Sequence, residues 1–287
     1  MLETEALTKR YPDGTVALDG VDLVVPSGAA VVLLGSNGSG KSTLLRCSVR
    51  LLEPTSGSVR IGDVDVVTAD ARELRRVRRG VGVVFQHINL VDHVSVLSNV
   101  LHGQLGRDGR PRQWFAVSAS RDARARAMHC LERAGVADFA ARRADQLSGG
   151  QRQRVALARM LMQEPTMVLA DEPVAALDPR AGREVMDLLW EIVEEDGLTL
   201  VCALHQLELA RAYGERIVGL RAGRKILDCS KDELTEADIS ALYDRDTTDG
   251  DSDSDPSSNG SRPGSAAEIG VEPGMGSVSR AVLGGGR

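Results

Sequence analysis

The fold is decided by one glycine-rich stretch, Gly35-Ser36-Asn37-Gly38-Ser39-Gly40-Lys41-Ser42. It follows the apolar run 30–34 and precedes residues 41–52, which have the spacing of a helix that Pro54 stops. An uninterrupted apolar run is typical of a strand buried on both faces, so this part of the chain predicts a strand, a loop and a helix in that order. That order is the setting in which a phosphate-binding loop is found.

The loop matches the pattern G-x-x-x-x-G-K-[ST] at every position. Glycines allow the backbone to curl until its N–H groups converge on phosphate oxygens, and the positive end of the following helix points at the same anion. We therefore predict a nucleoside triphosphate site in which Lys41 reaches the β- and γ-phosphates and the Ser42 hydroxyl ligates Mg²⁺. A surface loop that matches by chance is disfavoured, because a buried strand leads into this one.

A second apolar run, residues 167–170, ends in the two acids Asp171 and Glu172. An Asp at the end of a buried strand can hold Mg²⁺ through its water shell. The adjacent Glu172 can polarise a water molecule as a general base for attack on the γ-phosphate. Acidic strand ends are also common as solvated turns, so the pair alone is a weak signal. Together with the phosphate-binding loop it predicts a site for triphosphate hydrolysis.

Strands and helices alternate along much of the chain. Further strands are expected at 21–25, 57–61, 81–85, 198–204 and 217–220, and helices at 72–79, 151–162, 180–195 and 206–213. This alternation predicts an α/β fold whose mostly parallel sheet is covered on both faces. Residues from about 88 to 150 look helical instead, with a helix that begins after the cap Ser120 and ends at Gly135. They predict a helical subdomain inserted into the α/β frame.

Composition limits the other possibilities. The 287 residues carry a net charge of −6, which gives no overall basic field for nucleic acid. The four cysteines are far apart, so reduced thiols are expected rather than a metal site or disulfides. The arginines of 72–79 are compatible with a partner or phosphate patch, but a solvated helix face is the favoured reading. Residues 244–287 are rich in Asp, Ser, Gly and Pro, and we expect a disordered, passive tail after a domain spanning 1–243.

The segment between the loop and the acidic pair contains the motif Leu147-Ser148-Gly149-Gly150-Gln151, followed by a basic helix. On this motif the chain resembles the ABC ATPase family over residues 1 to about 243. The resemblance implies a P-loop NTPase fold of the ABC ATPase type, with an antiparallel N-terminal β subdomain and the inserted helical subdomain. In the family, this motif binds the γ-phosphate of ATP held by the opposite subunit, so that two copies enclose two ATP molecules.

The resemblance also implies roles for individual residues. The loop, extended to Thr43, binds ATP, and Tyr11 stands where an aromatic ring stacks on adenine. Gln86 matches the residue that senses Mg²⁺ and contacts the membrane partner. Asp178 matches the loop that crosses to the other subunit, and His205 matches the histidine that contacts the γ-phosphate.

Two positions depart from the family pattern. Ser36 replaces a frequent Pro in the loop, which we expect to be harmless. Ala175 replaces a frequent Ser in the crossing loop, which removes one cross-subunit hydrogen bond worth about 1 kcal/mol. The predicted acid, base and phosphate ligands are all present, so we still expect activity.

Three classes of ABC protein compete: importer, exporter and nucleic-acid-acting. One cassette, no heptad run and no basic stripe disfavour the third, and neither a signal peptide nor a membrane-spanning run is evident. Residues 85–107 and 204–218 resemble the ATPases of phosphonate importers. The resemblance implies a homodimer under two transmembrane permease subunits, with a solute-binding protein, on the cytoplasmic side of the cell membrane. An ATPase of a polar amino acid importer or of a separate-subunit exporter is the alternative.

Overall fold

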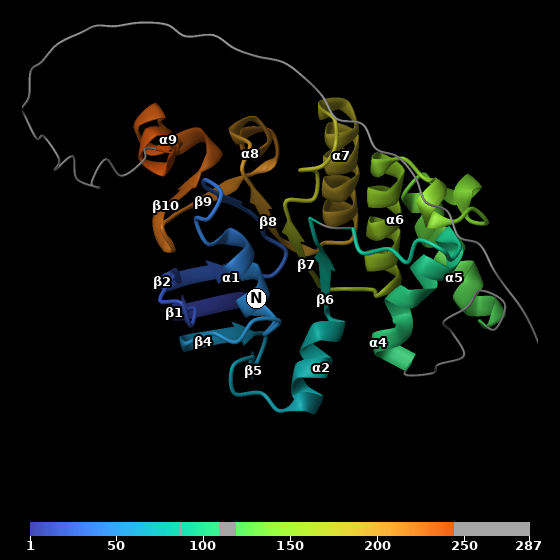
Figure 1. Ribbon diagram of the computed structural model, residues 1–287, viewed down its shortest axis with the longest axis horizontal. Coiled ribbons are helices and arrows are strands. Elements are labelled where there is room, and N and C mark those ends of the chain that lie inside the picture. Colours follow the sequence, from blue (N-terminus) through green and yellow to red (C-terminus); the bar gives the residue numbers. More distant parts are fainter. Residues whose placement is uncertain (87, 109–118, 244–287) are drawn as a thin grey trace, which may run out of the picture. The chain divides into compact units, whose positions relative to one another are not determined.

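The computed structural model describes residues 1–86, 88–108 and 119–243, and its strands form two sheets (Figure 1). The smaller sheet contains, in order, β2 (Val16–Val25), β1 (Leu2–Arg10), β4 (Ser56–Ile61) and β5 (Val64–Asp65). The larger sheet contains, in order, β10 (Arg224–Ser230), β9 (Arg216–Arg221), β3 (Ala30–Leu34), β8 (Thr199–Leu204), β7 (Met167–Asp171) and β6 (Val81–Val84). The smaller sheet is antiparallel, and in the larger sheet only β10 runs against its neighbour. This confirms the predicted fold class.

Helices cover the larger sheet on both faces. The α-helices are α1 (Lys41–Ser48), α2 (Ala71–Arg79), α3 (Val96–Leu101), α4 (Leu105–Asp108), α5 (Arg121–Arg133), α6 (Gly149–Met162), α7 (Pro179–Glu195), α8 (Leu207–Tyr213) and α9 (Glu236–Tyr243). Short 3-10 helices are η1 (His102–Gln104), η3 (Ala137–Phe139), η4 (Ala144–Gln146) and η5 (Lys231–Glu233). Between residues 88 and 150 the described segments are helical or irregular, apart from one isolated bridge; that they form an inserted subdomain stays a prediction.

Side chains of the central strands alternate between two apolar cores, as the pleat requires. Val32 and Leu34 of β3 pack toward α6 and α7, whereas Val31 and Leu33 pack toward α1 and the antiparallel sheet. Both faces of β3 are therefore buried, which is why its sequence is apolar without interruption. Helix α1 contacts strands of both sheets, so the loop that precedes it is fixed between them.

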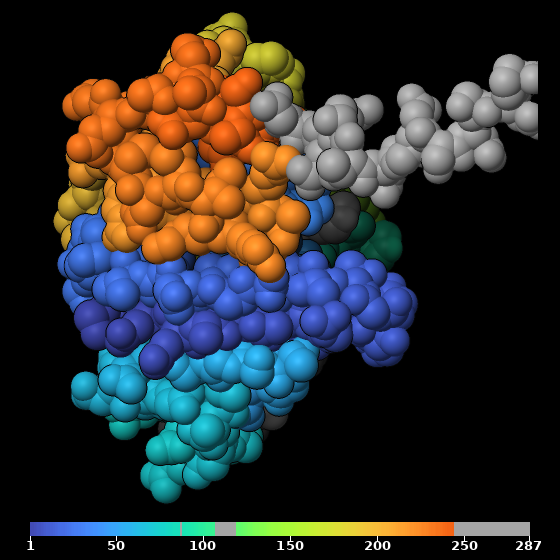
Figure 2. Space-filling view, turned by 90° about the vertical axis from the view of Figure 1, so that its left-hand side faces the viewer, coloured from blue at the N-terminus to red at the C-terminus, as the bar shows by residue number. Residues whose placement is uncertain are grey.

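The edge that carries β10 lies next to the antiparallel sheet. Figure 2 shows β10 and α9 in orange directly above the blue strands β1 and β2. The Asp19 N–H donates to the carbonyl of Gly223 at 2.9 Å, and Arg224 Nε donates to Asp19 Oδ2 at 2.8 Å. Arg216 Nη1 donates to the Val24 carbonyl at 2.7 Å. These contacts close the two sheets together beside β3.

Several boundaries differ from those expected. The helix predicted over 41–52 ends at Ser48, because Arg50 takes a left-handed conformation with φ +51° and turns the chain before Pro54. Strands β1, β5 and β10 and helix α9 were not individually predicted. The helix after Ser120 is confirmed, with Ser120 Oγ accepting from the Ala123 N–H. The predicted tail, 244–287, lies outside the described residues.

Candidate functional site

The phosphate-binding loop joins the carboxyl end of β3 to α1, as predicted. Gly40 caps α1 with φ +106°, and no side chain caps the helix. A Cβ atom on Gly40 would lie 2.5 Å from the Ala17 carbonyl oxygen, and one on Gly35 would lie 2.2 Å from the Leu220 carbonyl oxygen. Both positions therefore require glycine. The first N–H groups of α1 have no side-chain acceptor, so they remain available to an anion.

Lys41 lies under this loop and is only 4% exposed. Its Nζ donates to the carbonyls of Gly35 at 2.8 Å and Ser36 at 3.0 Å, and lies 3.8 Å from Glu172 Oε1. Burial lowers the pKa of Lys41 below its usual range, while the carboxylates of Glu172 and Asp171 act in the opposite direction. A buried ammonium in a glycine-rich loop at the N-terminus of a helix makes the loop electrostatically suited to a polyphosphate.

The acidic pair comes to the loop from β7. Ser42 Oγ donates to Asp171 Oδ1 at 2.6 Å, which joins the first turn of α1 to the end of β7. Arg46 Nη2 lies 3.5 Å from Asp171 Oδ2. A hydroxyl and a carboxylate side by side are oxygen ligands of the kind that Mg²⁺ prefers. Ser42 and Asp171 therefore fit the predicted metal site.

Glu172 lies between Lys41 and His205. His205 Nδ1, just beyond β8, lies 3.3 Å from Glu172 Oε2. Glu172 has φ +48°, an uncommon conformation for a residue other than glycine, and its N–H donates to the Ala203 carbonyl at 3.1 Å. Backbone strain of this kind is found at functional sites, where the surroundings hold it in place. Here it turns the side chain of Glu172 toward the loop.

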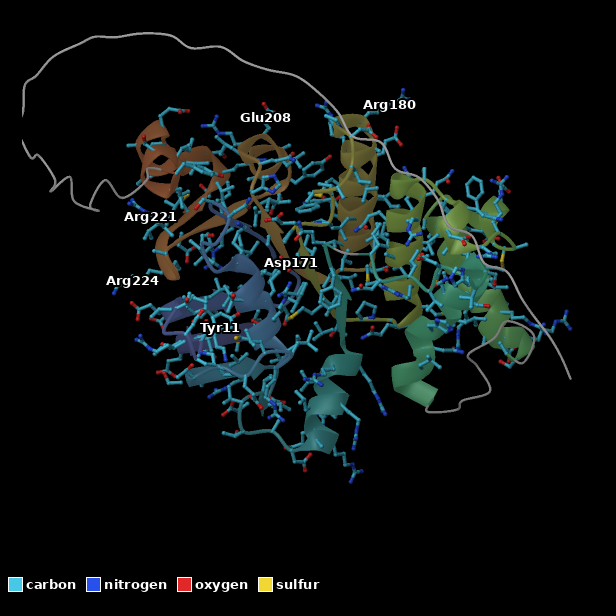
Figure 3. All side chains as sticks on the ribbon, viewed as in Figure 1. Tyr11, Asp171, Arg180, Glu208, Arg221 and Arg224 are labelled. Carbon is cyan, nitrogen blue, oxygen red and sulfur yellow. The ribbon has the colours of Figure 1, made fainter. Side chains whose placement is uncertain are left out.

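Lys41, Ser42 and Glu172 border a cavity of about 530 Å³, a size typical of small-molecule sites. Its walls come from the antiparallel sheet, the loop, α1 and the chain after β6: Tyr11, Thr15, Val16, Ala17, Asn37, Gly38, Ser39, Gly40, Lys41, Ser42, Thr43, Gln86 and Glu172. Ser39 Oγ is buried without a hydrogen-bond partner among the described residues. Figure 3 shows Tyr11 on the antiparallel sheet and Asp171 at the end of β7.

The remaining predicted residues form a separate cluster. Ser148 caps α6, and its Oγ accepts from the Gln151 N–H at 3.3 Å, while Gln151 Oε1 accepts from the Ser148 N–H at 3.0 Å. A Cβ atom on Gly149 would lie 3.1 Å from a methyl of Leu177, so this turn packs beside the start of α7. Asp178 caps α7 there. None of the residues 148–151, and not Asp178, lines the cavity beside Lys41.

Some residues of the site were not predicted from the sequence. Arg46 follows Ser42 by four residues, and that spacing places both side chains on one face of a helix. The contact between Arg46 and Asp171 could therefore have been predicted from the sequence. Val16 and Ala17 line the cavity as the first residues of β2, and Thr15, just before them, accepts from the Tyr11 N–H at 2.8 Å. Their types carry no signal of binding, and only the folded antiparallel sheet brings them there.

A family model described as ABC transporter matches residues 18–175. The chain belongs to the ABC transporter family. Among curated relatives, the phosphate-import ATP-binding protein PhnC of Mycolicibacterium smegmatis is 53% identical over 239 residues, which cover 83% of this chain and 90% of that protein. The phosphonates import ATP-binding protein PhnC of Nocardia farcinica is 50% identical over 245 residues, which cover 85% and 91% respectively.

Solved structures of ABC cassettes share the fold. The ATP-binding cassette MJ0796, in a dimeric post-hydrolysis state bound to ADP and Pi, has a TM-score of 0.71 and is 37% identical, with 80% of this chain and 99% of that chain covered. The protein cbiO1 of Clostridium perfringens, part of the ABC transporter complex cbiONQ, has a TM-score of 0.71 and is 31% identical, with 83% and 92% covered. The ABC ATPase fold of this chain is thus shown by both its sheets and its neighbours.

Proposed function

We propose that this chain is the ATP-binding and ATP-hydrolysing subunit of an ABC importer for phosphonates. ATP hydrolysis is supported by one observation: the side chains needed for it lie together at the carboxyl ends of parallel strands, beside one cavity. They are Lys41, the Ser42–Asp171 pair and the Glu172–His205 pair. Ligands of open α/β sheets bind at that edge of the sheet. The relatives in the ABC transporter family support the same activity.

The chain's own groups can perform hydrolysis in a few steps. N–H groups of the loop and Lys41 bind the β- and γ-phosphates, and Tyr11 stacks on the adenine at the mouth of the cavity. Glu172 accepts a proton from the water that attacks the γ-phosphorus, the bond from that phosphorus to the β-phosphate oxygen breaks, and ADP and phosphate are the products. His205 holds the Glu172 carboxylate and contacts the γ-phosphate. Ser42, Asp171 and Gln86 would hold Mg²⁺, which neutralises charge on the phosphates.

A second copy of the chain completes this site. The 148–151 turn and Asp178 lie outside the cavity, with Ser148 and Gly149 exposed. A helix N-terminus of this kind suits the γ-phosphate of ATP that is held by another subunit. We infer a symmetric homodimer in which each cavity is closed by the partner's 148–151 turn, so that ATP holds the pair together and hydrolysis releases it.

The transport role requires further partners. No helix in the described parts of the chain has the length and apolar character needed to traverse a bilayer. We propose two transmembrane permease subunits above the homodimer, with a solute-binding protein in the complex, and a peripheral position on the cytoplasmic side of the cell membrane. We propose no nucleic-acid partner, in keeping with the net charge of −6.

The cargo proposal rests on the relatives, because no residue of such a subunit touches the cargo. The Nocardia farcinica relative is named for phosphonates import and the Mycolicibacterium smegmatis relative for phosphate import. Both names describe phosphorus oxyanions, and phosphonate agrees with the sequence resemblance. A polar amino acid importer and a separate-subunit exporter are the alternatives.

Growth of a deletion strain tests the proposal. Cells without this gene should fail to grow on a phosphonate as sole phosphorus source while still growing on phosphate. The wild-type gene should restore growth, and Glu172→Gln should not. If the deletion instead impaired phosphate uptake, and the wild-type gene restored only that uptake, the cargo would be phosphate rather than phosphonate. Unchanged growth on both sources would contradict a phosphorus importer and direct the same test to polar amino acids.

A further inference from the structure

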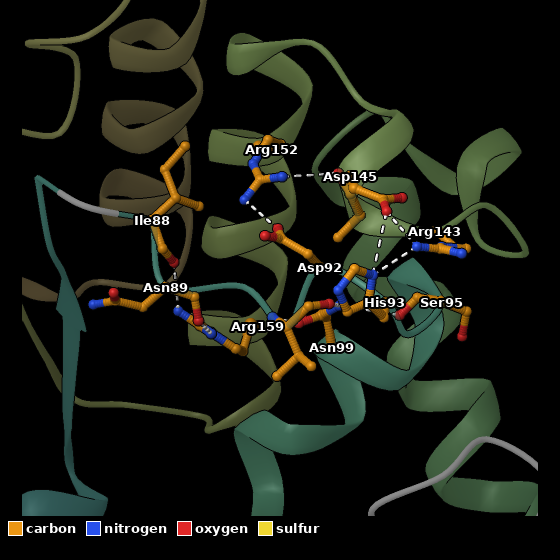
Figure 4. A network of polar contacts seen from close by, with 12 residues as sticks. Ile88, Asn89, Asp92, His93, Ser95, Asn99, Arg143, Asp145, Arg152 and Arg159 are labelled. Carbon is orange, nitrogen blue, oxygen red and sulfur yellow. Dashed lines mark hydrogen bonds and ion pairs between the residues drawn. The ribbon is translucent and has the colours of Figure 1, made fainter. Parts of the chain in front are cut away.

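The segment 88–95, which follows Gln86, has no helix or strand of its own and is held by one face of α6. Arg159 Nη1 donates to the Asn89 carbonyl at 2.7 Å, and its Nη2 donates to the Ile88 carbonyl at 3.1 Å. Arg152 Nη2 donates to Asp92 Oδ1 at 2.7 Å (Figure 4). Arg152 and Arg159 are seven positions apart, about two helical turns, so both project from the same face of α6.

Arg152 also holds the segment that leads into the 148–151 turn. Its Nη1 donates to the Ala144 carbonyl at 3.1 Å. The backbones of the two segments pair directly, because the Asp145 N–H donates to the Asp92 carbonyl and the Ala144 N–H donates to the Val94 carbonyl, both at 3.2 Å. One guanidinium at the start of α6 therefore joins the segment after Gln86 to the segment before Ser148.

The geometry favours a specific role over a passive surface pair. Exposed ion pairs generally contribute little, but the Arg152 side chain is only 25% exposed and Asp92 is 50% exposed. The planar guanidinium contacts a carboxylate and a carbonyl at once, in a fork that a Lys ammonium cannot reproduce. Gln86 lines the cavity and Ser148 caps the exposed turn, so Arg152 contacts both the segment 88–95, which lies after the cavity residue in the chain, and the segment that leads into the turn.

We propose that Arg152 and Asp92 are positioning residues for ATP hydrolysis. They fix the 148–151 turn relative to the segment 88–95, and this contact sets how the turn is presented to the second subunit. The inference rests on the proposed function, and it adds a physical connection between the site within one chain and the surface that completes the site of the other.

The test uses the full chain with Arg152→Lys, Asp92→Asn and the double variant. Three quantities are measured: affinity for a fluorescent ATP analogue, steady-state kcat and KM for MgATP, and ATP-induced dimerisation in a Glu172→Gln background. We expect kcat to fall about three- to tenfold, as for residues on a coupling route, with nucleotide affinity unchanged. Dimerisation should weaken in parallel, and the double variant should be no worse than the more impaired single variant.

Arg211→Ala is the control. It removes an exposed ion pair in which Arg211 of α8 and Glu236 of α9 lie 2.9 Å apart. It should leave all three quantities unchanged. Unchanged kcat in the Arg152 and Asp92 variants would overturn the proposal, and so would a parallel loss of kcat, nucleotide affinity and thermal stability, which would indicate a purely structural pair. A wild-type chain that binds nucleotide without hydrolysing it would instead overturn the proposed function, and the positioning role with it.

Discussion

Two glycine-containing loops of this chain each begin a helix, and they treat the helix N-terminus in opposite ways. The loop before α1 has no side-chain cap, its cap residue Gly40 has φ +106°, and Lys41 is buried beneath it. The turn before α6 is closed by Ser148 and Gln151, which cap each other's N–H groups at the surface. The first loop leaves its donors free inside the chain's own cavity, whereas the second satisfies two of its donors, the N–H groups of Ser148 and Gln151, with its own side chains.

This difference indicates what each loop can bind alone. The orphan N–H groups of α1 face a cavity with a buried ammonium, so one chain suffices to attract phosphate. At α6 the capping box competes with any incoming anion, and the glycines of the turn lie beside the start of α7. The N–H groups at the start of a helix thus form a complete phosphate site in the loop before α1. In the turn before α6 they form part of an interface that another molecule completes.

Glu172→Gln should have the largest effect and separates chemistry from binding. The amide keeps the shape of the side chain beside Lys41 and His205 but cannot accept the proton of the attacking water. We expect the ATPase rate to fall by about 10²-fold or more, since a general base contributes about 10²–10⁴. Phosphate release from MgATP measures the rate, and size-exclusion chromatography with ATP should show a trapped dimer.

Glu191→Gln makes the same chemical change at an exposed position on α7 and should leave the rate unchanged. A Glu172→Gln chain that hydrolyses ATP at the wild-type rate would show that another group activates the water.

Lys41→Ala should break the loop that acts within one chain. It removes the ammonium from the cavity and leaves the carboxylates of Glu172 and Asp171 without their buried cation. We expect ATP affinity to fall by at least about tenfold, because a charged hydrogen bond contributes about 1.5–3 kcal/mol. Equilibrium binding of a fluorescent ATP analogue to the isolated chain measures this loss.

Lys225→Ala is the control, because Lys225 pairs with Asp228 on β10 and lines no part of the cavity. Equal affinity of the Lys41→Ala chain and the wild type would remove Lys41 from the phosphate site.

The sequence predicts best where strands are buried on both faces. β3 and residues 167–170 of β7 were predicted because they are apolar throughout. The loop between β3 and α1 was predicted because its residues match a motif with fixed spacing. β1 was not predicted because its buried residues, Leu2, Thr4 and Leu7, do not alternate regularly along the strand. The alternation breaks at a register shift between Thr4 and Leu7. Ala6 there has φ +46°.

The residues of the site were predicted from their types and motifs, but the contacts between them could be seen only in the folded structure. No local pattern indicates that Glu172 contacts both Lys41 and His205, because these residues come from three different strands and loops. Nor does spacing reveal that Arg152 touches Asp92, sixty positions earlier. The roles of the individual site residues remain predictions, and the structure gives their positions.

Ser148→Ala should have the smallest effect on stability and tests the second loop. It removes the oxygen that accepts from the Gln151 N–H, which should cost about 1 kcal/mol of unfolding free energy and a few degrees in Tm. Ser120→Ala is a closely matched control, because Ser120 Oγ caps α5 in the same way and lies outside both clusters. The two variants should lose similar stability in thermal unfolding.

Only Ser148→Ala should also weaken ATP-induced dimerisation and lower the ATPase rate, because its hydroxyl belongs to the turn that is proposed to close the partner's cavity. Nucleotide affinity of the isolated chain should stay at the wild-type value in both variants, since neither serine lines the cavity. Equal ATPase rates in the two variants would mean that the Ser148 hydroxyl is only a helix cap. The interface role would then have to come from the glycine N–H groups alone, and the contrast between the two loops would be one of exposure rather than of function.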